Sequence, residues 1–273
     1  MKVNALVLTG NGTNCEVESA YAISTAGAEA VTVGTIWELM EGTLTLDAFN
    51  FLCLPGGFLD GDHLGSARAG AHRFAHGTPG KGAEPLMDQI RQLLERGGLI
   101  IGICNGFQLL VKLGLLPGPE LEQRVTLTHN LSGRFEDRWV TLSADPDSPC
   151  VFTRGLHQIE LPVRHGEGRL VYSSPAEQSR CQANGLIPLV YVDPKTSLPT
   201  ELYPLNPNGS PGGAAAMTDS TGRIFGLMPH PEAFTHFTNH PRWTRQTMPE
   251  EGAGLSLFKN GISYLHQKEP HDA

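Results

Sequence analysis

Short apolar runs alternate with amphipathic stretches through the first half of the chain. The apolar runs predict strands at Val3–Leu8, Ala30–Val33, Phe49–Leu54 and Leu99–Ile103. The amphipathic stretches predict helices from the capping-box pair Thr13 and Glu16 to Ala26, over Glu84–Arg96, and over Gly106–Leu116. Strands that are apolar on both faces and joined by helices are typical of a three-layer α/β fold with a mostly parallel, doubly wound sheet.

The second half of the chain alternates less regularly. Strands are expected at Val125–Thr128, Trp139–Leu142, Ile187–Val192, Ala214–Met217 and Ile224–Met228, and a last helix runs from Gly254 to about Gln267. Two stretches, His72–Ala83 and Arg242–Gly252, are expected to be insertions or flexible loops. Because the chain has no internal repeat and no low-complexity tract, we expect a single domain over residues 1–273.

The amino-acid composition limits which partners the chain is expected to bind and in which cellular compartment it is expected to work. The formal net charge of -8 argues against a broad electrostatic hold on nucleic acid or on an anionic membrane. The five cysteines are an odd number without a C-x-x-C pair, which favours a reducing, cytoplasmic setting over a disulfide framework or a zinc ribbon. We expect neither a signal peptide nor a membrane span, since no apolar run is long enough for a span.

The pentapeptide Gly102–Gly106 has the form G-x-C-x-G, between a predicted strand and a predicted helix. This is the cysteine counterpart of the nucleophile elbow in hydrolases. Glycines beside Cys104 allow close approach of backbone and substrate, and the helix N-terminus favours the thiolate. The N–H group of Asn105 is then placed to bind an oxyanion. On the pentapeptide alone, a buried structural cysteine is an equal alternative.

The tripeptide His230-Pro231-Glu232 supplies the base that this cysteine needs. It follows a predicted strand, and residues i and i+2 of an extended backbone point to the same side. Glu232 could therefore orient the imidazole of His230, as the third member of a catalytic triad does. Two polar loop residues are the alternative reading, which the pairing with G-x-C-x-G disfavours. The turn Leu54–Gly57 could add a second oxyanion N–H group from Gly57, although it is by itself only a turn signal.

The heptapeptide Gly102–Gln108, the P-G-G turn and the H-P-E tripeptide resemble the class I (triad) glutamine amidotransferases. Within that family, six segments resemble the glutaminase subunits of phosphoribosylformylglycinamidine synthase: Asn14-Cys15, Leu54–Asp62, Asn130–Trp139, His165–Arg169, Asn206–Ser210 and Met228–Glu232. The resemblance implies a flavodoxin-like α/β fold. It also implies that the chain hydrolyses L-glutamine and supplies ammonia for the ATP-dependent amidation of formylglycinamide ribonucleotide in purine biosynthesis.

The resemblance further implies a role for each site residue. Cys104 forms a γ-glutamyl thioester, His230 moves the protons, and Glu232 orients His230. The residues implied for substrate binding are Gly56, Gly57, Asn105, Gln108, Asn130 and Phe135, with Gly57 and Asn105 acting through backbone N–H groups. No metal and no cofactor are expected in this chain. ATP and Mg²⁺ are expected on a separate synthetase subunit, and a small accessory subunit is a further candidate partner. Gly77–Gly82 lacks the spacing of a phosphate-binding P-loop.

Two segments depart from the compact members of the family. Residues 69–85 are expected to be an insertion, and residues 235–273 an extended C-terminal tail. Both could face a partner, but insertions without function are commoner, and the type of assembly stays open.

Other histidines and cysteines are assigned no chemistry. The pairs His72/His76 and His236/His240 favour solvated loops over metal sites. His165 and Glu167 belong either to a framework near the partner or to a structural turn. Cys53 is expected in the core, and Cys15 is expected to be inert, because no base lies near it in sequence.

Two rival functions remain in view. One is another cysteine enzyme of the same superfamily, such as a γ-glutamyl hydrolase or a protease/chaperone-like protein. The latter usually carries its histidine directly after the nucleophile, where this chain has Asn105. The other is an inactive module that only binds a partner, against which the intact set Cys104, His230 and Glu232 argues.

Overall fold

A six-stranded sheet forms the centre of the computed structural model, which describes residues 1–118 and 121–268. Its strands lie in the order β10 (Ala216–Thr218), β11 (Ile224–Leu227), β4 (Leu99–Ile103), β3 (Phe51–Leu54), β1 (Asn4–Thr9) and β2 (Ala30–Thr35). Five of them are parallel, and β10 at one edge is antiparallel to β11. Every residue of β3, β4 and β11 is buried, as their uninterrupted apolar sequences require.

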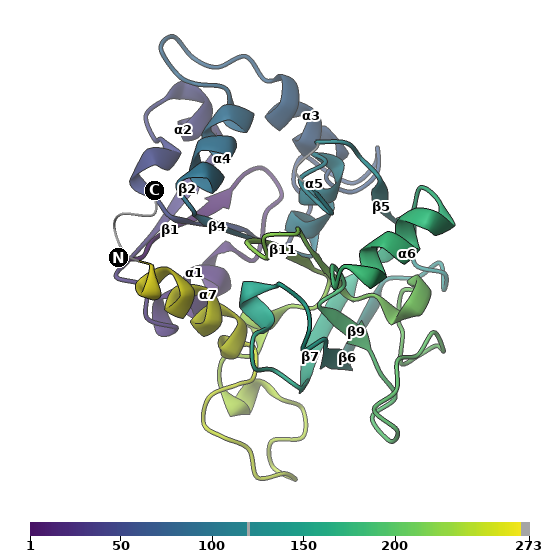
Figure 1. Cartoon of the computed structure of the whole chain (residues 1–273). Coiled ribbons are helices and arrows are strands. Elements are labelled where there is room, and N and C mark those ends of the chain that lie inside the picture. Colours follow the sequence, from purple (N-terminus) through teal and green to yellow (C-terminus); the bar gives the residue numbers. More distant parts are fainter. Residues whose placement is uncertain (119–120, 269–273) are drawn as a thin grey trace.

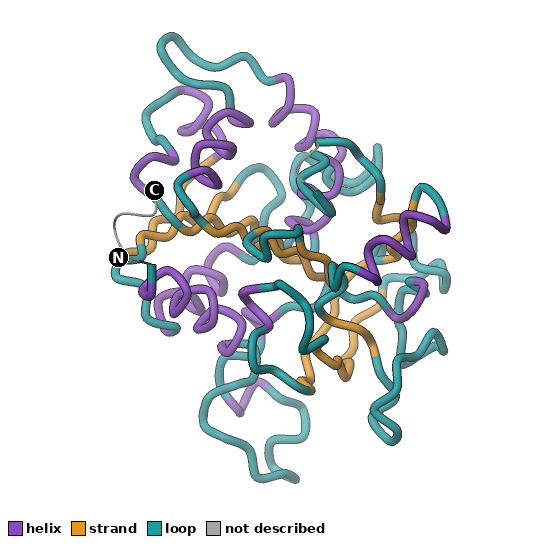
Figure 2. Tube along the Cα trace, in the orientation of Figure 1, coloured by secondary structure: helices purple, strands orange, loops and turns teal. Residues whose placement is uncertain are grey.

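Helices cover both faces of this sheet (Figure 1). One face carries α1 (Glu16–Thr25) and α7 (Leu255–Gln267), and the other carries α2 (Ile36–Glu41), α3 (Arg68–His76), α4 (Leu86–Glu95) and α5 (Asn105–Lys112). Figure 2 shows the resulting order of helix, strand and helix layers. The predicted three-layer, mostly parallel α/β fold is thereby confirmed.

Two smaller antiparallel sheets extend the carboxyl edge of the central one. In the first, β5 (Val125–Thr128) pairs with β8 (Arg169–Tyr172), and in the second, β6 (Glu136–Ala144) lies between β7 (Gln158–His165) and β9 (Leu189–Tyr191). Helix α6 spans Pro175–Ala183. Short 3₁₀ turns occupy Leu46–Ala48, Val151–Thr153, Pro211–Gly213, Pro231–Ala233 and Phe237–Asn239. The backbone of β7 reaches the central sheet, because the His230 N–H group donates to the Pro162 carbonyl at 2.8 Å.

Besides α3, two strands and two helices were not predicted from the sequence, although the two helices begin with recognisable capping residues. Strand β7 contains Pro162, which breaks a strand pattern but is tolerated because β7 is an edge strand. Strand β8 is only four residues long. The Ser174 hydroxyl caps α6 by accepting from the Glu177 N–H group, and α2 begins with a capping box of Thr35 and Glu38.

Two predictions near the N-terminal half were wrong. The first part of the predicted loop His72–Ala83 belongs to α3, whose Phe74 is buried. The expected insertion 69–85 therefore contributes to the core. Thr13 does not cap α1, since the helix begins at Glu16 and the Thr13 hydroxyl accepts from the Gly10 N–H group at 3.2 Å. Residues 10–14 instead form a turn that pairs with Gly57.

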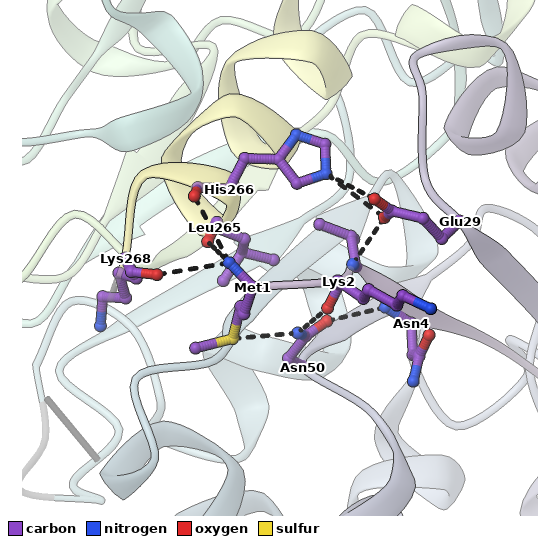
Figure 3. A network of polar contacts seen from close by, with 9 residues as sticks. Met1, Lys2, Asn4, Glu29, Asn50, Leu265, His266 and Lys268 are labelled. Carbon is purple, nitrogen blue, oxygen red and sulfur yellow. Dashed lines mark hydrogen bonds and ion pairs between the residues drawn. The ribbon is translucent and has the colours of Figure 1, made fainter. Parts of the chain in front are cut away.

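The two ends of the described chain meet beside the sheet (Figure 3). The N-terminal ammonium group lies 3.3–3.4 Å from the carbonyl oxygens of Leu265, His266 and Lys268 at the end of α7. A positive charge is favourable there, because a helix C-terminus carries partial negative charge. Helix α7 is the expected last helix of the extended C-terminal tail 235–273, and its apolar face is part of the core. Residues 269–273 of that extension lie outside the described residues.

None of the helices within residues 1–118 and 121–268 is both long and apolar enough to cross a membrane. The prediction of a single domain over residues 1–273 stays a prediction.

Candidate active site

Cys104 stands on a strained turn between β4 and α5. Its φ of 51° and ψ of -101° are unusual for a residue with a side chain. The Cys104 N–H group donates to the Leu227 carbonyl at 2.7 Å, which ties the turn to β11. Its thiol, 6% exposed, lies 3.6 Å from the Arg164 carbonyl oxygen. Strain of this kind persists where the surrounding structure enforces it, and it is common at reactive residues.

The two glycines of G-x-C-x-G make this turn sterically feasible. A Cβ atom on Gly106 would lie 1.9 Å from the Leu54 carbonyl oxygen. A Cβ atom on Gly102 would lie 2.7 Å from the carbonyl group of Gly106. The elbow therefore packs directly on the end of β3, as the sequence reading required.

His230 and Glu232 form a buried pair beside the elbow. The His230 Nδ1–H group donates to Glu232 Oε1 at 2.5 Å, and the two residues are 2% and 3% exposed. With the proton on Nδ1, the buried Nε2 atom is the acceptor, and it has no hydrogen-bond partner among the described residues. Nε2 is therefore available to take a proton.

The charge of Glu232 decides the protonation of this imidazole. Burial by itself lowers the pKa of His230, but the charges of Glu232 and Cys104 outweigh it and hold the pKa well above the usual 6.5. A raised histidine pKa favours an imidazolium beside a thiolate. This is the charge arrangement that an activated cysteine needs.

Arg164 of β7 lies against the same pair. Its Nη2 atom is 3.2 Å from His230 Nδ1 and 3.7 Å from Glu232 Oε1. Because Nδ1 already donates its hydrogen to Glu232, it cannot also accept one from the guanidinium. The favourable contact is therefore the ion pair between Arg164 and Glu232.

The backbone N–H groups of Asn105 and Gly57 are the two that were expected to bind an oxyanion, and this role stays a prediction. Asn105 is the first residue of α5, so its N–H group has no partner within the helix and carries the positive end of the helix dipole. Gly57 has a φ of 141°, and a Cβ atom there would lie 2.7 Å from the Gly12 carbonyl oxygen. The pairing of this turn with residues 12–14 uses the N–H groups of Phe58 and Asn14.

A cavity of about 260 Å³ opens above the thiol, lined by Asn14, Cys15, Glu18, Gly57, Phe58, Asp62, Ser66, Cys104, Gln108, Phe135, Arg164, His165, Gly166, Glu167 and His230. Three of these residues are acidic. One carboxylate oxygen of Asp62 is buried and has no hydrogen-bond partner in the described part of the chain, and burial raises the pKa of Asp62. The Ser66 N–H group holds Glu167 at 3.2 Å. Acidic groups at this depth suit a ligand that carries an ammonium group.

The expected substrate-binding residues divide into two groups. Gly57, Gln108 and Phe135 line the cavity, whereas the side chain of Asn105 supports the fold by accepting from the Leu59 N–H group. The Gln108 amide is held between the Glu167 carbonyl, at 2.7 Å, and the Asn105 amide, at 2.9 Å. Its contact with glutamine stays a prediction.

Asn130 and Gly56 do not line the cavity, contrary to expectation. Asn130 is buried and fully used: its amide donates to the carbonyls of Arg134 and His165 and accepts from the Gly168 N–H group and His165 Nδ1. It shapes the turn 165–168 that forms the cavity wall. Gly56 lies behind His230, where a Cβ atom would be 2.8 Å from the imidazole Cε1.

Among the cavity residues that were not assigned a role from sequence are Cys15, Asp62, Arg164 and Glu167. Three of them lie within segments that carry the family resemblance, and this resemblance was the sequence feature that could have identified them. Arg164 precedes such a segment by one residue and gave none. Cys15 was expected to lack a nearby base, but the fold places its thiol among the donor atoms of His230 and Glu232.

The histidine pairs lie apart from this site. His72 and His76 are exposed on α3, with ring centroids 4.9 Å apart, and the potential metal-binding cluster found within the described residues does not include them. His240 was expected to be solvated, but it is 1% exposed and contacts Glu160 at 2.8 Å.

Comparison with known proteins agrees with this geometry. The sequence model of the CobB/CobQ-like glutamine amidotransferase domain matches residues 2–265. The chain is 44% identical, over 97% of its length and 99% of the relative, to phosphoribosylformylglycinamidine synthase subunit PurQ of Dehalococcoides mccartyi. It is 36% identical to the subunit of that name from Methanococcus maripaludis, over 98% and 100% of the two chains. A chain in the solved structure of PurLQS from Thermotoga maritima is similar with a TM-score of 0.70 and 28% identity, over 97% and 100% of the chains.

Proposed function

The chain belongs to the family of CobB/CobQ-like glutamine amidotransferase domains, and from this membership we propose that it is the glutaminase subunit of a phosphoribosylformylglycinamidine synthase. The observation that carries the proposal is that Cys104 and His230 line one cavity, while the buried Glu232 binds His230 at 2.5 Å. Cysteine, imidazole and carboxylate in this arrangement support acyl transfer through a thioester.

The first half of the reaction transfers the γ-glutamyl group to sulfur. The Cys104 thiolate attacks the carboxamide carbon of glutamine, and the oxyanion that forms is bound by the N–H groups of Asn105 and Gly57. When the C–N bond breaks, the His230 imidazolium gives its Nε2 proton to the departing nitrogen, so that ammonia leaves. The product on the enzyme is a γ-glutamyl thioester.

The second half returns the enzyme to its starting state. The neutral imidazole takes a proton from water, which attacks the thioester carbon, and the C–S bond breaks to release glutamate and the Cys104 thiolate. Glu232 keeps Nδ1 protonated throughout, so that Nε2 is always the nitrogen that exchanges the proton. Asp62 and Glu167 are proposed to hold the α-ammonium group of the substrate.

Ammonia then passes to a synthetase subunit that amidates formylglycinamide ribonucleotide. In this proposal ATP and Mg²⁺ bind to the synthetase, and a small accessory subunit is a further candidate member of the complex. We infer a cytoplasmic location from the five free cysteines among the described residues, all of them buried.

Glutamate release tests this proposal. The purified chain is assayed alone and with its cognate synthetase, formylglycinamide ribonucleotide and ATP, beside Cys104→Ala and the matched variant Cys181→Ala on α6. We expect slow release alone, strong stimulation in the complex, and loss only in Cys104→Ala. Equal and substantial turnover with and without the synthetase would contradict the coupled subunit, and no turnover in either condition would indicate an inactive module.

A further inference from the structure

Cys15 is a buried thiol beside the catalytic pair that the proposed reaction does not use. It follows β1, it is 5% exposed, and it lines the cavity together with Cys104 and His230. Its sulfur, a ring nitrogen of His230 and a carboxylate oxygen of Glu232 all lie within 4.8 Å of one another. Gly56 makes room for this cluster, because a Cβ atom there would be 3.2 Å from the Cys15 sulfur.

The three donors are those that zinc prefers. Thiolate sulfur, imidazole nitrogen and carboxylate oxygen bind Zn²⁺ at about 2.0–2.3 Å in a tetrahedral arrangement. The second carboxylate oxygen of Glu232 is buried and has no partner among the described residues. Two of the three residues, Cys15 and His230, line the cavity, so an ion from solvent can reach the cluster there. We propose that Cys15, His230 and Glu232 form an inhibitory Zn²⁺ site.

Binding at this site changes the proton balance of the triad. Zn²⁺ replaces the proton between His230 Nδ1 and Glu232 Oε1 and the proton on the Cys15 thiol, and both protons pass to solvent. A neutral imidazole that binds metal through Nδ1 carries its hydrogen on Nε2. That nitrogen then keeps its hydrogen and no longer exchanges protons with the departing nitrogen and the attacking water, so the reaction stops. The donors must separate by about 1 Å, since Nδ1 and Oε1 are 2.5 Å apart without metal.

Neighbouring groups set the affinity of this site. The Arg164 guanidinium repels a cation, because Nη2 lies 3.2 Å from Nδ1, but the side chain is 36% exposed and can turn away. Cys53 is the next thiol in the core, and burial raises its pKa so far that it stays protonated and is a poor ligand. A requirement for Cys15 therefore distinguishes this site from zinc binding by Cys104 and His230 alone.

Co²⁺ binding tests the site without any catalytic readout. Charge-transfer absorption between thiolate and Co²⁺ is recorded for Cys104→Ala, Cys104→Ala/Cys15→Ser and Cys104→Ala/Cys181→Ser, with thermal unfolding as a check of folding. We expect the band in the first and third proteins and its loss in the second. A band that survives Cys15→Ser in the folded protein overturns the proposal. Cys15→Ala is the second variant if Cys15→Ser fails to fold.

Zinc inhibition tests the consequence, and only this readout rests on the proposed function. Glutaminase activity of each protein is normalised to its own rate without zinc. Cys15→Ser should raise the half-inhibitory Zn²⁺ concentration at least about tenfold, and Arg164→Ala should lower it. Unchanged inhibition in Cys15→Ser contradicts the site. Absence of activity without zinc would instead overturn the proposed function, while the Co²⁺ result would still decide the metal site.

Discussion

At the scale of single residues, Cys104 and His230 are each held in a state that they would not adopt in isolation. The backbone of Cys104 is strained, with φ at 51°, and the pKa of the His230 imidazole is raised although the ring is buried. Neighbouring groups enforce both states: the Leu227 carbonyl binds the Cys104 N–H group, and the Glu232 carboxylate binds the ring. Reactivity here therefore depends on residues that do not touch the scissile bond.

Glu232→Gln should move the alkaline limb of the pH profile. The charge of Glu232 raises the pKa of His230, so its removal lets the imidazolium lose its proton at lower pH. The alkaline limb of kcat/KM should therefore shift to lower pH, and activity should fall about 100-fold or more. The comparison is a pH series for the wild type, Glu232→Gln and the exposed control Glu251→Gln. An unshifted limb would show that Glu232 does not set the charge of His230.

Asp62→Asn should weaken glutamine binding. One oxygen of the partly buried carboxylate has no partner within residues 1–118 and 121–268, and a charge-assisted hydrogen bond to an ammonium group is worth about 1.5–3 kcal/mol. KM for glutamine should therefore rise by about tenfold or more, while kcat changes less. Steady-state kinetics check this, with Asp88→Asn on the exposed side of α4 as the control. A normal KM would place the ammonium group elsewhere.

The catalytic residues could be predicted from the sequence better than the other residues that line the cavity. Cys104, His230 and Glu232 carry local patterns that follow apolar strands, and these patterns suffice to recognise a triad. Asn130 was placed in the pocket because its motif suggested it, yet its amide is consumed by the turn 165–168. Contacts between residues so far apart in the chain cannot be predicted from the spacing of residues in the sequence.

At the scale of elements, the site is a junction of three strand ends. Strand β4 carries the elbow, β3 ends against Gly106, and β11 ends at Leu227, three residues before His230. Strand β7 then closes the junction from a separate sheet through the Pro162 carbonyl. The geometry of the triad is therefore set by sheet register.

Gly106→Ala should disrupt this junction. The added Cβ atom would lie 1.9 Å from the Leu54 carbonyl oxygen, which is backbone and cannot turn aside. We expect a loss of about 1–3 kcal/mol or more in the free energy of unfolding, together with loss of glutaminase activity. Gly166→Ala is the matched control for stability, because its Cβ atom would meet only the Phe135 ring, at 3.8 Å. Equal stability of the two variants in urea unfolding would contradict the packing described.

The elements themselves were predictable where the pattern was continuous. Strand β4 and β5 have the predicted bounds, and α7 differs by one residue, because uninterrupted apolar runs and strong amphipathic spacing leave one solution. Helix α3 was missed, since only its small residues and Phe74 face the core and its other face is rich in histidine and arginine. Strand β7 was missed because Pro162 resembles a break.

At the scale of the whole molecule, the fold buries titratable groups whose protonation opposes folding. His165 is buried against Asn130, and burial, followed by the charge of His230, lowers the pKa of His165 to about 3. Its folded pKa thus lies below the value of about 6.5 in the unfolded chain. Between these values the unfolded chain binds a proton that the folded chain does not, so stability falls as the pH is lowered.

His165→Gln should reduce this acid sensitivity. The wild type should lose up to about 1.4 kcal/mol per pH unit through His165 as the pH falls below 6.5, and the variant should lack this contribution. His230 does not confuse the comparison, because its raised pKa places its own effect above pH 6.5. Urea unfolding of both proteins from pH 7 to pH 5 measures the difference in slope. Parallel slopes would show that His165 is protonated in the folded protein.

The central claim is that Cys104 forms the covalent bond to the glutamyl group. The direct test is to treat the protein with a glutamine analogue that carries an electrophilic chloroketone in place of the amide, and to map the modified cysteine by peptide mass spectrometry. We predict one label per chain, on Cys104, prevented by excess glutamine and absent from Cys15. Loss of glutaminase activity with Cys104 unmodified and the label on another cysteine would contradict the account.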